Sequence, residues 1–139
     1  MTVVIDASVV IKWLLKDPER EANTDKATDL MKAVVTGDQP ALQPTHWIVE
    51  VGAVLARESP ASAVDDITML NALELPATDE PQVLARGVAL ATELRQHLFD
   101  TFYHAVALEA QDRVLITADD RYLRAARRKG QIVHLADWE

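Results

Sequence analysis

Apolar residues follow two different patterns along this chain. In two short segments, Val3–Ile5 and Val114–Ile116, they run without interruption. Short continuous runs of β-branched and aliphatic residues are typical of strands that are buried on both faces. Most other apolar residues recur at intervals of three and four, which predicts helices with one inward face. The alternation of these patterns predicts an α/β fold in which helices cover both sides of a parallel sheet.

Capping residues and end signals set the bounds of the other elements. A proline just after a capping side chain marks a helix start, and a glycine after the last turn marks a helix end. The predicted helices are a short one through Val9–Leu14, one from Asp17-Pro18-Glu19 to Gly37, one from Thr45 through Leu55, one from Ser59-Pro60 through Leu73, one from Thr78 or Asp79 through Leu94, one over Phe99–Gln111, and one that ends at Lys129 before Gly130. Weaker strands are predicted at Ala41–Gln43, at Glu74–Pro76 on a sheet edge, and at Ile132–Leu135.

Length and composition restrict the class of protein. A chain of 139 residues without an internal repeat or linker predicts one domain, residues 1–139. The absence of cysteine excludes disulfides, zinc–thiolate sites and iron–sulfur clusters. The net charge of -8 argues against polyanion binding by the whole surface, although a local nucleic-acid site stays open. No apolar run has the length of a membrane span and no signal peptide begins the chain, so we expect a cytoplasmic protein with no membrane partner.

Four acidic residues occupy places where a charge needs an explanation. Asp6 ends the first apolar strand and Asp119 follows the second, while Asp100 opens the most apolar helix. Glu50 lies on the apolar face of its predicted helix, three residues after Trp47. Each acid also has an ordinary structural alternative. The three aspartates can cap helices, and Glu50 can be a boundary residue that reaches water.

Carboxylates that converge at one end of a sheet repel one another and raise each other's pKa values unless cations are present. Oxygen-only ligands select hard ions such as Mg²⁺, with Mn²⁺ as the alternative. Such ions activate water and stabilise charge on phosphate, and a pair of them about 3.5–4 Å apart can clamp both reacting oxygens. If the four acids meet, phosphodiester hydrolysis is the chemistry that fits them.

Four segments of the chain carry a resemblance to a known family. They read Val-Ile-Asp-Ala-Ser-Val-Val-Ile-Lys-Trp from Val4, Pro-Thr-His-Trp-Ile-Val-Glu-Val from Pro44, Phe-Asp-Thr-Phe-Tyr-His-Ala-Val-Ala from Phe99, and Leu-Ile-Thr-Ala-Asp from Leu115. In order, spacing and context they resemble PIN-domain ribonucleases of the VapC toxin family, over essentially the whole chain. The resemblance implies a three-layer α/β/α sandwich with a central parallel sheet. It also implies a Mg²⁺-dependent endoribonuclease that leaves 5′-phosphate and 3′-hydroxyl ends, forms a homodimer and is inhibited by a cognate VapB-type antitoxin.

The same resemblance assigns roles to individual residues. It implies that the catalytic and metal-binding acids are Asp6, Glu50, Asp100 and Asp119, and that the supporting hydroxyls belong to Ser8 and Thr117. Gly52-Ala53 departs from the family, in which many members have Ala-Asn, so a polar support near Glu50 is missing. Asp120 directly follows Asp119, and the family pattern favours Asp119 as the fourth acid.

Basic and histidine residues near these acids are candidates for RNA contacts. Arg121 begins a basic run in the last helix and is the best candidate for holding RNA, although the run can equally be a solvated helix face. His104 lies one turn beyond Asp100 and is a second candidate, with a surface or core-edge role as the stronger alternative. Trp13 and Trp47 exceed what one core needs in this interpretation, which favours a dimer.

Other function classes fit the sequence less well. A haloacid-dehalogenase-like phosphatase needs a second aspartate where the chain has Ser8, and a receiver domain needs a lysine after its last strand, where the chain has Ala136-Asp137. Glycine-rich nucleotide-binding loops are absent. The strongest remaining alternative is a catalytically silent PIN-like module that binds RNA or a protein.

Overall fold

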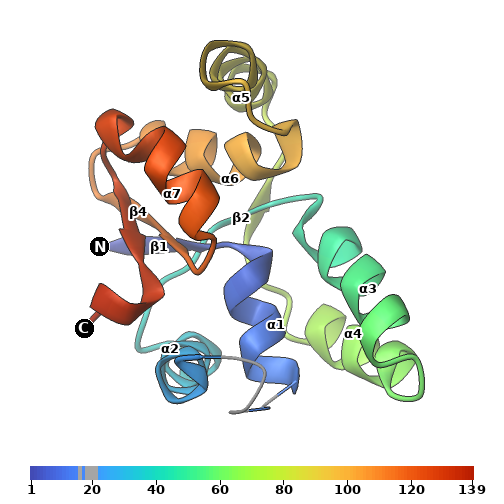
Figure 1. Cartoon of the computed structure of the whole chain (residues 1–139). Helices are drawn as coiled ribbons and strands as arrows, with labels where there is room; N and C mark the ends of the chain where they lie inside the picture. Colours follow the sequence, from blue (N-terminus) through green and yellow to red (C-terminus); the bar gives the residue numbers. More distant parts are fainter. Residues whose placement is uncertain (16, 18–21) are drawn as a thin grey trace.

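The structure is a computed structural model that describes residues 1–15, 17 and 22–139. Its strands are β1 (Thr2–Ile5), β2 (Gln43–Pro44), β3 (Ala77–Thr78), β4 (Arg113–Thr117) and β5 (Ile132–His134). Its α-helices are α1 (Ala7–Leu15), α2 (Thr24–Thr36), α3 (Trp47–Glu58), α4 (Ala63–Ala72), α5 (Pro81–Leu94), α6 (Leu98–Leu108) and α7 (Asp120–Ala126), and the 3₁₀ turns are η1 (Arg127–Lys129) and η2 (Leu135–Asp137). Figure 1 shows their arrangement along the chain.

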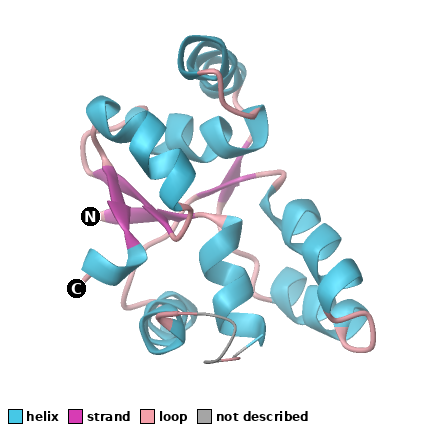
Figure 2. Cartoon of the chain, viewed as in Figure 1, coloured by secondary structure: helices cyan, strands magenta, loops and turns pink. Residues whose placement is uncertain are grey.

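The central sheet is parallel and has the strand order β1-β4-β5. The two apolar runs of the sequence pair in it, with Val4 opposite Leu115 and Ile5 opposite Ile116. All four of these side chains are buried, because helices lie over both faces of the strands. Figures 1 and 2 show α1 and α2 on one side and α5, α6 and α7 on the other. The predicted α/β/α arrangement with a central parallel sheet is therefore confirmed.

A second parallel pair, β2 and β3, continues the sheet beyond β1 through two contacts. Val3 forms a single bridge with Ala41, and the buried Gln43 side chain bonds to the backbone of Ile5. The Gln43 amide donates to the Ile5 carbonyl oxygen at 2.8 Å, and its carbonyl oxygen accepts from the Ile5 N–H at 2.8 Å. One side chain thus supplies the two hydrogen bonds that a neighbouring strand would make.

The two weaker strands were predicted a few residues too early. The first was expected at Ala41–Gln43 and lies at Gln43–Pro44. The second was expected at Glu74–Pro76 and lies at Ala77–Thr78. Glu74 has a left-handed φ of 50°, and proline has no N–H to give to a ladder, so pairing begins only after Pro76.

Glycine marked helix ends more reliably than proline marked helix starts. Gly37 follows α2 with a φ of 85°, and Gly130 follows η1 with a φ of 77°. The predicted start at Asp17-Pro18-Glu19 lies mostly outside the described residues, and α2 begins at Thr24. The helix expected from Thr78 or Asp79 begins at Pro81, because the Thr78 hydroxyl oxygen first accepts from the N–H of Glu80 in the turn before it.

Of the two tryptophans in the dimer argument, Trp47 provides no spare apolar surface, and Trp13 provides only the part that is not buried. Trp47 is only 5% exposed and belongs to the core of this chain, while Trp13 is half-buried against it. Within the described residues, no helix combines the length and the apolar character needed to cross a bilayer.

Candidate metal centre

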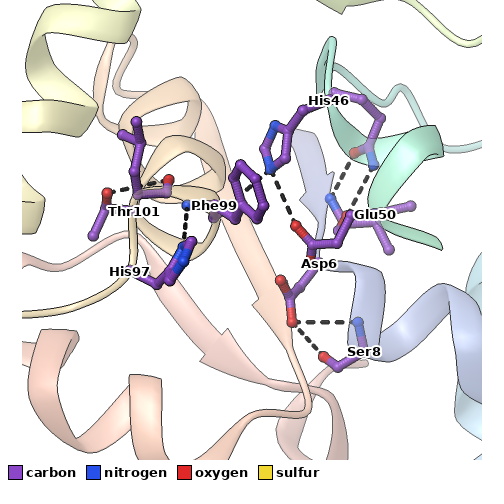
Figure 3. Close-up of polar contacts among 10 residues, drawn as sticks. Asp6, Ser8, His46, Glu50, His97, Phe99 and Thr101 are labelled. Carbon is purple, nitrogen blue, oxygen red and sulfur yellow. Dashed lines mark hydrogen bonds and ion pairs between the residues drawn. The ribbon is translucent and has the colours of Figure 1, made fainter. Parts of the chain in front are cut away.

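Three of the four predicted acids meet where β1 ends. Asp6 follows β1, Glu50 lies in the first turn of α3, and Asp100 lies in the first turn of α6. Each contributes a carboxylate oxygen to a cluster in which all of these oxygens lie within 4.8 Å of one another. Figure 3 shows Asp6 between Ser8 on one side and Glu50 with His46 on the other.

Asp6 is held by hydroxyl groups from two segments. Its Oδ2 accepts hydrogen bonds from the Ser8 hydroxyl and, at 3.2 Å, from the Thr117 hydroxyl. The Ser8 hydroxyl oxygen in turn accepts from the Ala118 N–H at 3.0 Å. Both supporting hydroxyls that the sequence indicated therefore contact the first acid. Gln43, which the sequence did not single out, fixes Ile5 directly before it.

Glu50 is oriented by a histidine one turn earlier. His46 Nε2 lies 3.2 Å from Glu50 Oε2 and 3.0 Å from the carbonyl oxygen of Phe99. The single N–H at Nε2 can make a well-aligned hydrogen bond to only one of these oxygens, and it points to the Phe99 carbonyl. Glu50 Oε2 is therefore buried without a hydrogen bond. The polar support expected from an Asn at position 53 is absent, since Ala53 is exposed.

Asp100 is placed by the close crossing of α5 and α6. The adjacent Thr101 hydroxyl donates to the carbonyl oxygen of Gly87 at 2.8 Å. A Cβ on Gly87 would lie 3.4 Å from the Cα of Phe102, in van der Waals contact, so the two helices cross closely here. At the start of α6, His97 Nδ1 accepts from the Phe99 N–H at 3.2 Å and caps the helix.

Asp119 stands at the edge of this cluster. It caps α7 by accepting from the Tyr122 N–H at 3.0 Å, and its own N–H donates to the Thr117 hydroxyl oxygen at 3.0 Å. Its charge acts on Asp100, and the two line one pocket. Asp120 is exposed and pairs with His134 at 3.2 Å. This arrangement favours Asp119 over Asp120 as the fourth acid.

Electrostatics in the cluster are unfavourable without a cation. Burial, together with the negative charge of Glu50, raises the pKa of Asp6 to about 6 despite its hydroxyl donors. Burial and the charges of Asp6, Glu50 and Asp119 likewise raise the pKa of Asp100 to about 6. Burial and the charges of Asp6, Glu50 and Asp100 also raise the pKa of Tyr103, whose hydroxyl is buried without a well-formed hydrogen bond. Perturbed groups gathered at one place are typical of functional sites.

The donor set fits a hard divalent cation. Every ligand atom of the cluster is a carboxylate oxygen, three side chains converge, and one buried oxygen of Glu50 accepts no hydrogen bond. These are the ligands that Mg²⁺ and Mn²⁺ prefer. Asp6, Glu50 and Asp100 would hold such a cation.

The two candidates for RNA contacts differ in exposure: Arg121 is accessible to RNA and His104 is not. Arg121 is exposed and lines the pocket beside Asp100 and Asp119. His104 is fully buried, with Nδ1 2.9 Å from the Tyr122 hydroxyl and Nε2 2.8 Å from the Gly130 carbonyl oxygen. Burial lowers the pKa of His104. An RNA contact by His104 is therefore wrong for this structure, because both ring nitrogens are used inside the core.

Comparisons with known proteins agree with this architecture. A comparison with curated proteins found no match. Among solved structures, a toxin–antitoxin complex from Klebsiella pneumoniae superposes with a TM-score of 0.65, covering 96% of this chain and 97% of that chain at 18% identity. At this identity the likeness shows a shared fold. The PIN domain profile matches residues 3–128, which is most of the chain. With the acid cluster at the end of its parallel strands, the chain belongs to the PIN domain family.

Proposed function

We propose that this chain is a metal-dependent endoribonuclease of the VapC toxin type. The observation that carries the proposal is the convergence of Asp6, Glu50 and Asp100, with a buried Glu50 oxygen that accepts no hydrogen bond. PIN domains are generally nucleases, and three convergent carboxylates fit that chemistry. The K. pneumoniae neighbour is a toxin–antitoxin complex, which supports the toxin assignment.

Each residue of the proposed site has a role that follows from its position. Asp6, Glu50 and Asp100 would hold the cation, which would supply activation of a water molecule and stabilisation of charge on the phosphodiester. Ser8 and Thr117 hold Asp6 in one orientation, and His46 limits the movement of Glu50. Asp119 adds negative charge beside Asp100, and Arg121 offers a guanidinium to the RNA backbone.

The test is cleavage of a mixed RNA pool by purified protein with Mg²⁺, with Mn²⁺ and with a chelator. We expect cleavage only with metal, and none by Asp6→Asn, which keeps its affinity for RNA. Asp112→Asn is the matched control, because Asp112 is an exposed acid before β4. Cleavage by Asp6→Asn at the wild-type rate would overturn the metal-site assignment. A wild-type protein that cuts no RNA with either metal would favour the silent RNA- or protein-binding module.

An antitoxin and a second copy of the chain are the proposed protein partners. The antitoxin rests on the toxin–antitoxin neighbour, and the homodimer rests on the VapC resemblance. We expect the activity in the cytoplasm, where RNA is available. Light scattering at micromolar concentration tests the dimer, and a mass of only 15.4 kDa would count against it.

A further inference from the structure

Phe99 exposes an aromatic ring at the edge of the acid cluster. It is 52% exposed, and it alone is aromatic among the exposed large hydrophobic side chains of the described residues. It directly precedes Asp100, so its backbone is fixed by the same first turn of α6 that presents the acid. Scattered exposed aliphatic side chains need no explanation, but an exposed ring beside convergent carboxylates does.

The ring belongs to an ordered column of aromatic side chains. Phe102 and His46 stack at 5.2 Å and 13°, and His46 and Phe99 stack at 5.3 Å and 30°. His97 follows at 4.8 Å from Phe99, tilted by 50°. Figure 3 shows Phe99 between His97 and His46. The column is buried at Phe102 and exposed at Phe99 and His97.

Hydrogen bonds hold the column in place before any ligand binds. His46 Nε2 is 3.0 Å from the Phe99 carbonyl oxygen, and His97 Nδ1 accepts from the Phe99 N–H. Rings that are already ordered lose little conformational entropy when a flat ligand stacks on them. The exposed end of the column is therefore a prepared stacking surface.

A pocket with two guanidinium groups adjoins this surface. It has a volume of about 310 Å³ and is lined by Arg95, Gln96, His97, Asp100, Asp119 and Arg121. His97 belongs to both the pocket and the column. Neither arginine side chain makes an ion pair with another described residue.

Arg95, which lines this pocket, is the residue that caps the end of α5. Arg95 has a φ of 54° at the end of α5, the left-handed region that glycine favours. This is the left-handed cap common at helix ends, and the Arg95 N–H donates to the Ala91 carbonyl oxygen. Two guanidinium groups that pair with no described acid favour an anionic group as the ligand of this pocket.

We propose that this region binds one nucleotide of the RNA strand next to the bond that is cut. Its base packs on His97 and against the exposed side of the Phe99 ring, and its phosphate lies between Arg95 and Arg121. Aromatic stacking combined with basic side chains is how proteins hold single-stranded nucleic acid without reading its sequence. The proposal rests on the proposed function, since it takes RNA as the ligand.

The test measures binding without cleavage, in the Asp6→Asn background, by fluorescence anisotropy of labelled single-stranded oligoadenylate. Phe99→Leu keeps an apolar side chain and removes the ring. We expect it to weaken binding roughly 5- to 100-fold, because stacking on one aromatic ring contributes about that much per base. Phe99→Trp should retain binding. Val64→Ala, which trims an exposed apolar residue on α4, is the matched control and should change nothing.

A second ligand separates stacking from general damage. A base-free ribose-phosphate oligomer of the same length offers phosphates but nothing to stack. The Asp6→Asn protein should bind this oligomer equally well with and without the added Phe99→Leu change. Arg95→Gln should weaken the binding of both ligands and lower the salt dependence by about one phosphate contact.

Three results would overturn the stacking proposal. The first is unchanged oligoadenylate binding by Phe99→Leu, and the second is an equal loss of affinity for the base-free oligomer. The third is a change in protein association without RNA, which would make the ring a protein-binding surface. Failure of the proposed function gives a different pattern, in which the Asp6→Asn protein binds no RNA whether or not Phe99 is present.

Discussion

The side chains of Asp6 and Thr117 are joined by a hydrogen bond of 3.2 Å, although 111 residues separate them in the chain. The same Thr117 hydroxyl oxygen accepts from the Asp119 N–H at 3.0 Å. One buried hydroxyl thus connects the end of β1 with the start of α7, and the first acid with the fourth. Partners of this kind, one step removed from a metal, orient the ligands themselves.

Replacing Thr117 by valine keeps the shape and removes both hydrogen bonds. We expect Thr117→Val to lose about 1–3 kcal/mol of unfolding free energy, because the buried Asp6 carboxylate loses a donor and the part-buried Asp119 N–H loses its acceptor. Mn²⁺ affinity should fall roughly 10-fold, since Asp6 is no longer held. Urea unfolding and calorimetric titration measure the two effects. Thr117→Ser, which keeps the hydroxyl, is the control, and a valine variant with wild-type Mn²⁺ affinity would contradict the role.

The metal-free protein should lose stability as the pH rises from about 4 to about 6. The pKa values of Asp6 and Asp100 are raised to about 6 in the folded state, against 3.8 for an ordinary aspartate. In that pH range the folded state keeps protons that the unfolded state has released, so its stability falls as the protons leave. The contribution of these two groups is complete below pH 4 and lost above about pH 6.

Asp100→Asn isolates this effect, because the amide carries no charge. We expect the variant to be more stable than wild type at about pH 8 without metal, and the difference to vanish near pH 4. Mn²⁺ should raise the melting temperature of wild type but not of the variant. Urea unfolding at several pH values with a chelator measures the difference. Asp112→Asn is the exposed control, and an Asp100→Asn variant that is less stable under the alkaline condition would contradict the prediction.

The neighbouring acids Asp119 and Asp120 provide a matched pair. Asparagine caps helices as well as aspartate does, so Asp119→Asn should keep the stability of α7. Its cleavage rate should nevertheless fall roughly 10-fold or more, because charge beside Asp100 is lost. Asp120→Asn removes only an exposed pairing with His134 and should retain full activity. Equal losses of cleavage rate in both variants would contradict the assignment of Asp119, and not Asp120, as the fourth acid.

The sequence predicted best those features for which a residue type in a given local pattern has few alternative structural roles. Uninterrupted apolar runs predicted the paired strands β1 and β4, and the acid directly after the first run lies in the cluster at the sheet edge. Glu50 was the sharpest case, since a carboxylate on an apolar helix face needs a polar partner in space. Each of these features depends on the local pattern of residues alone, so the sequence could predict it.

Residues that act through distant partners were missed. The Gln43 side chain makes the two backbone hydrogen bonds with Ile5 that a paired strand would make. Nothing in the local sequence of Gln43 indicates that Ile5 is its neighbour. The role of His104 could not be predicted for the same reason, because its partners Tyr122 and Gly130 follow it by 18 and 26 residues. The role of such residues depends on which elements pack together, which periodicity does not specify.

His104 and Arg121 should therefore respond in opposite ways to substitution. His104→Leu leaves the buried Tyr122 hydroxyl without a partner and should cost about 1–3 kcal/mol, whereas the Gly130 carbonyl belongs to an exposed residue. RNA affinity of the folded protein should stay unchanged. Arg121→Gln should weaken RNA binding and leave unfolding unaffected. A His104→Leu protein that unfolds like wild type but binds RNA more weakly would restore the histidine as an RNA contact.

Tyr103 offers the last and most specific test of the cluster. Its hydroxyl is fully buried and has at most a weak contact with the Ala7 backbone, while the charges of Asp6, Glu50 and Asp100 act on it. An unsatisfied buried hydroxyl costs about 1–3 kcal/mol, so Tyr103→Phe should raise the melting temperature of the metal-free protein. Hydrated cations bring water molecules that accept hydrogen bonds, so the same variant should bind Mn²⁺ more weakly. Thermal unfolding with and without Mn²⁺ separates the two effects. A variant that melts lower without metal and binds Mn²⁺ normally would show that the hydroxyl has its partner within the protein, and that the cluster does not need it.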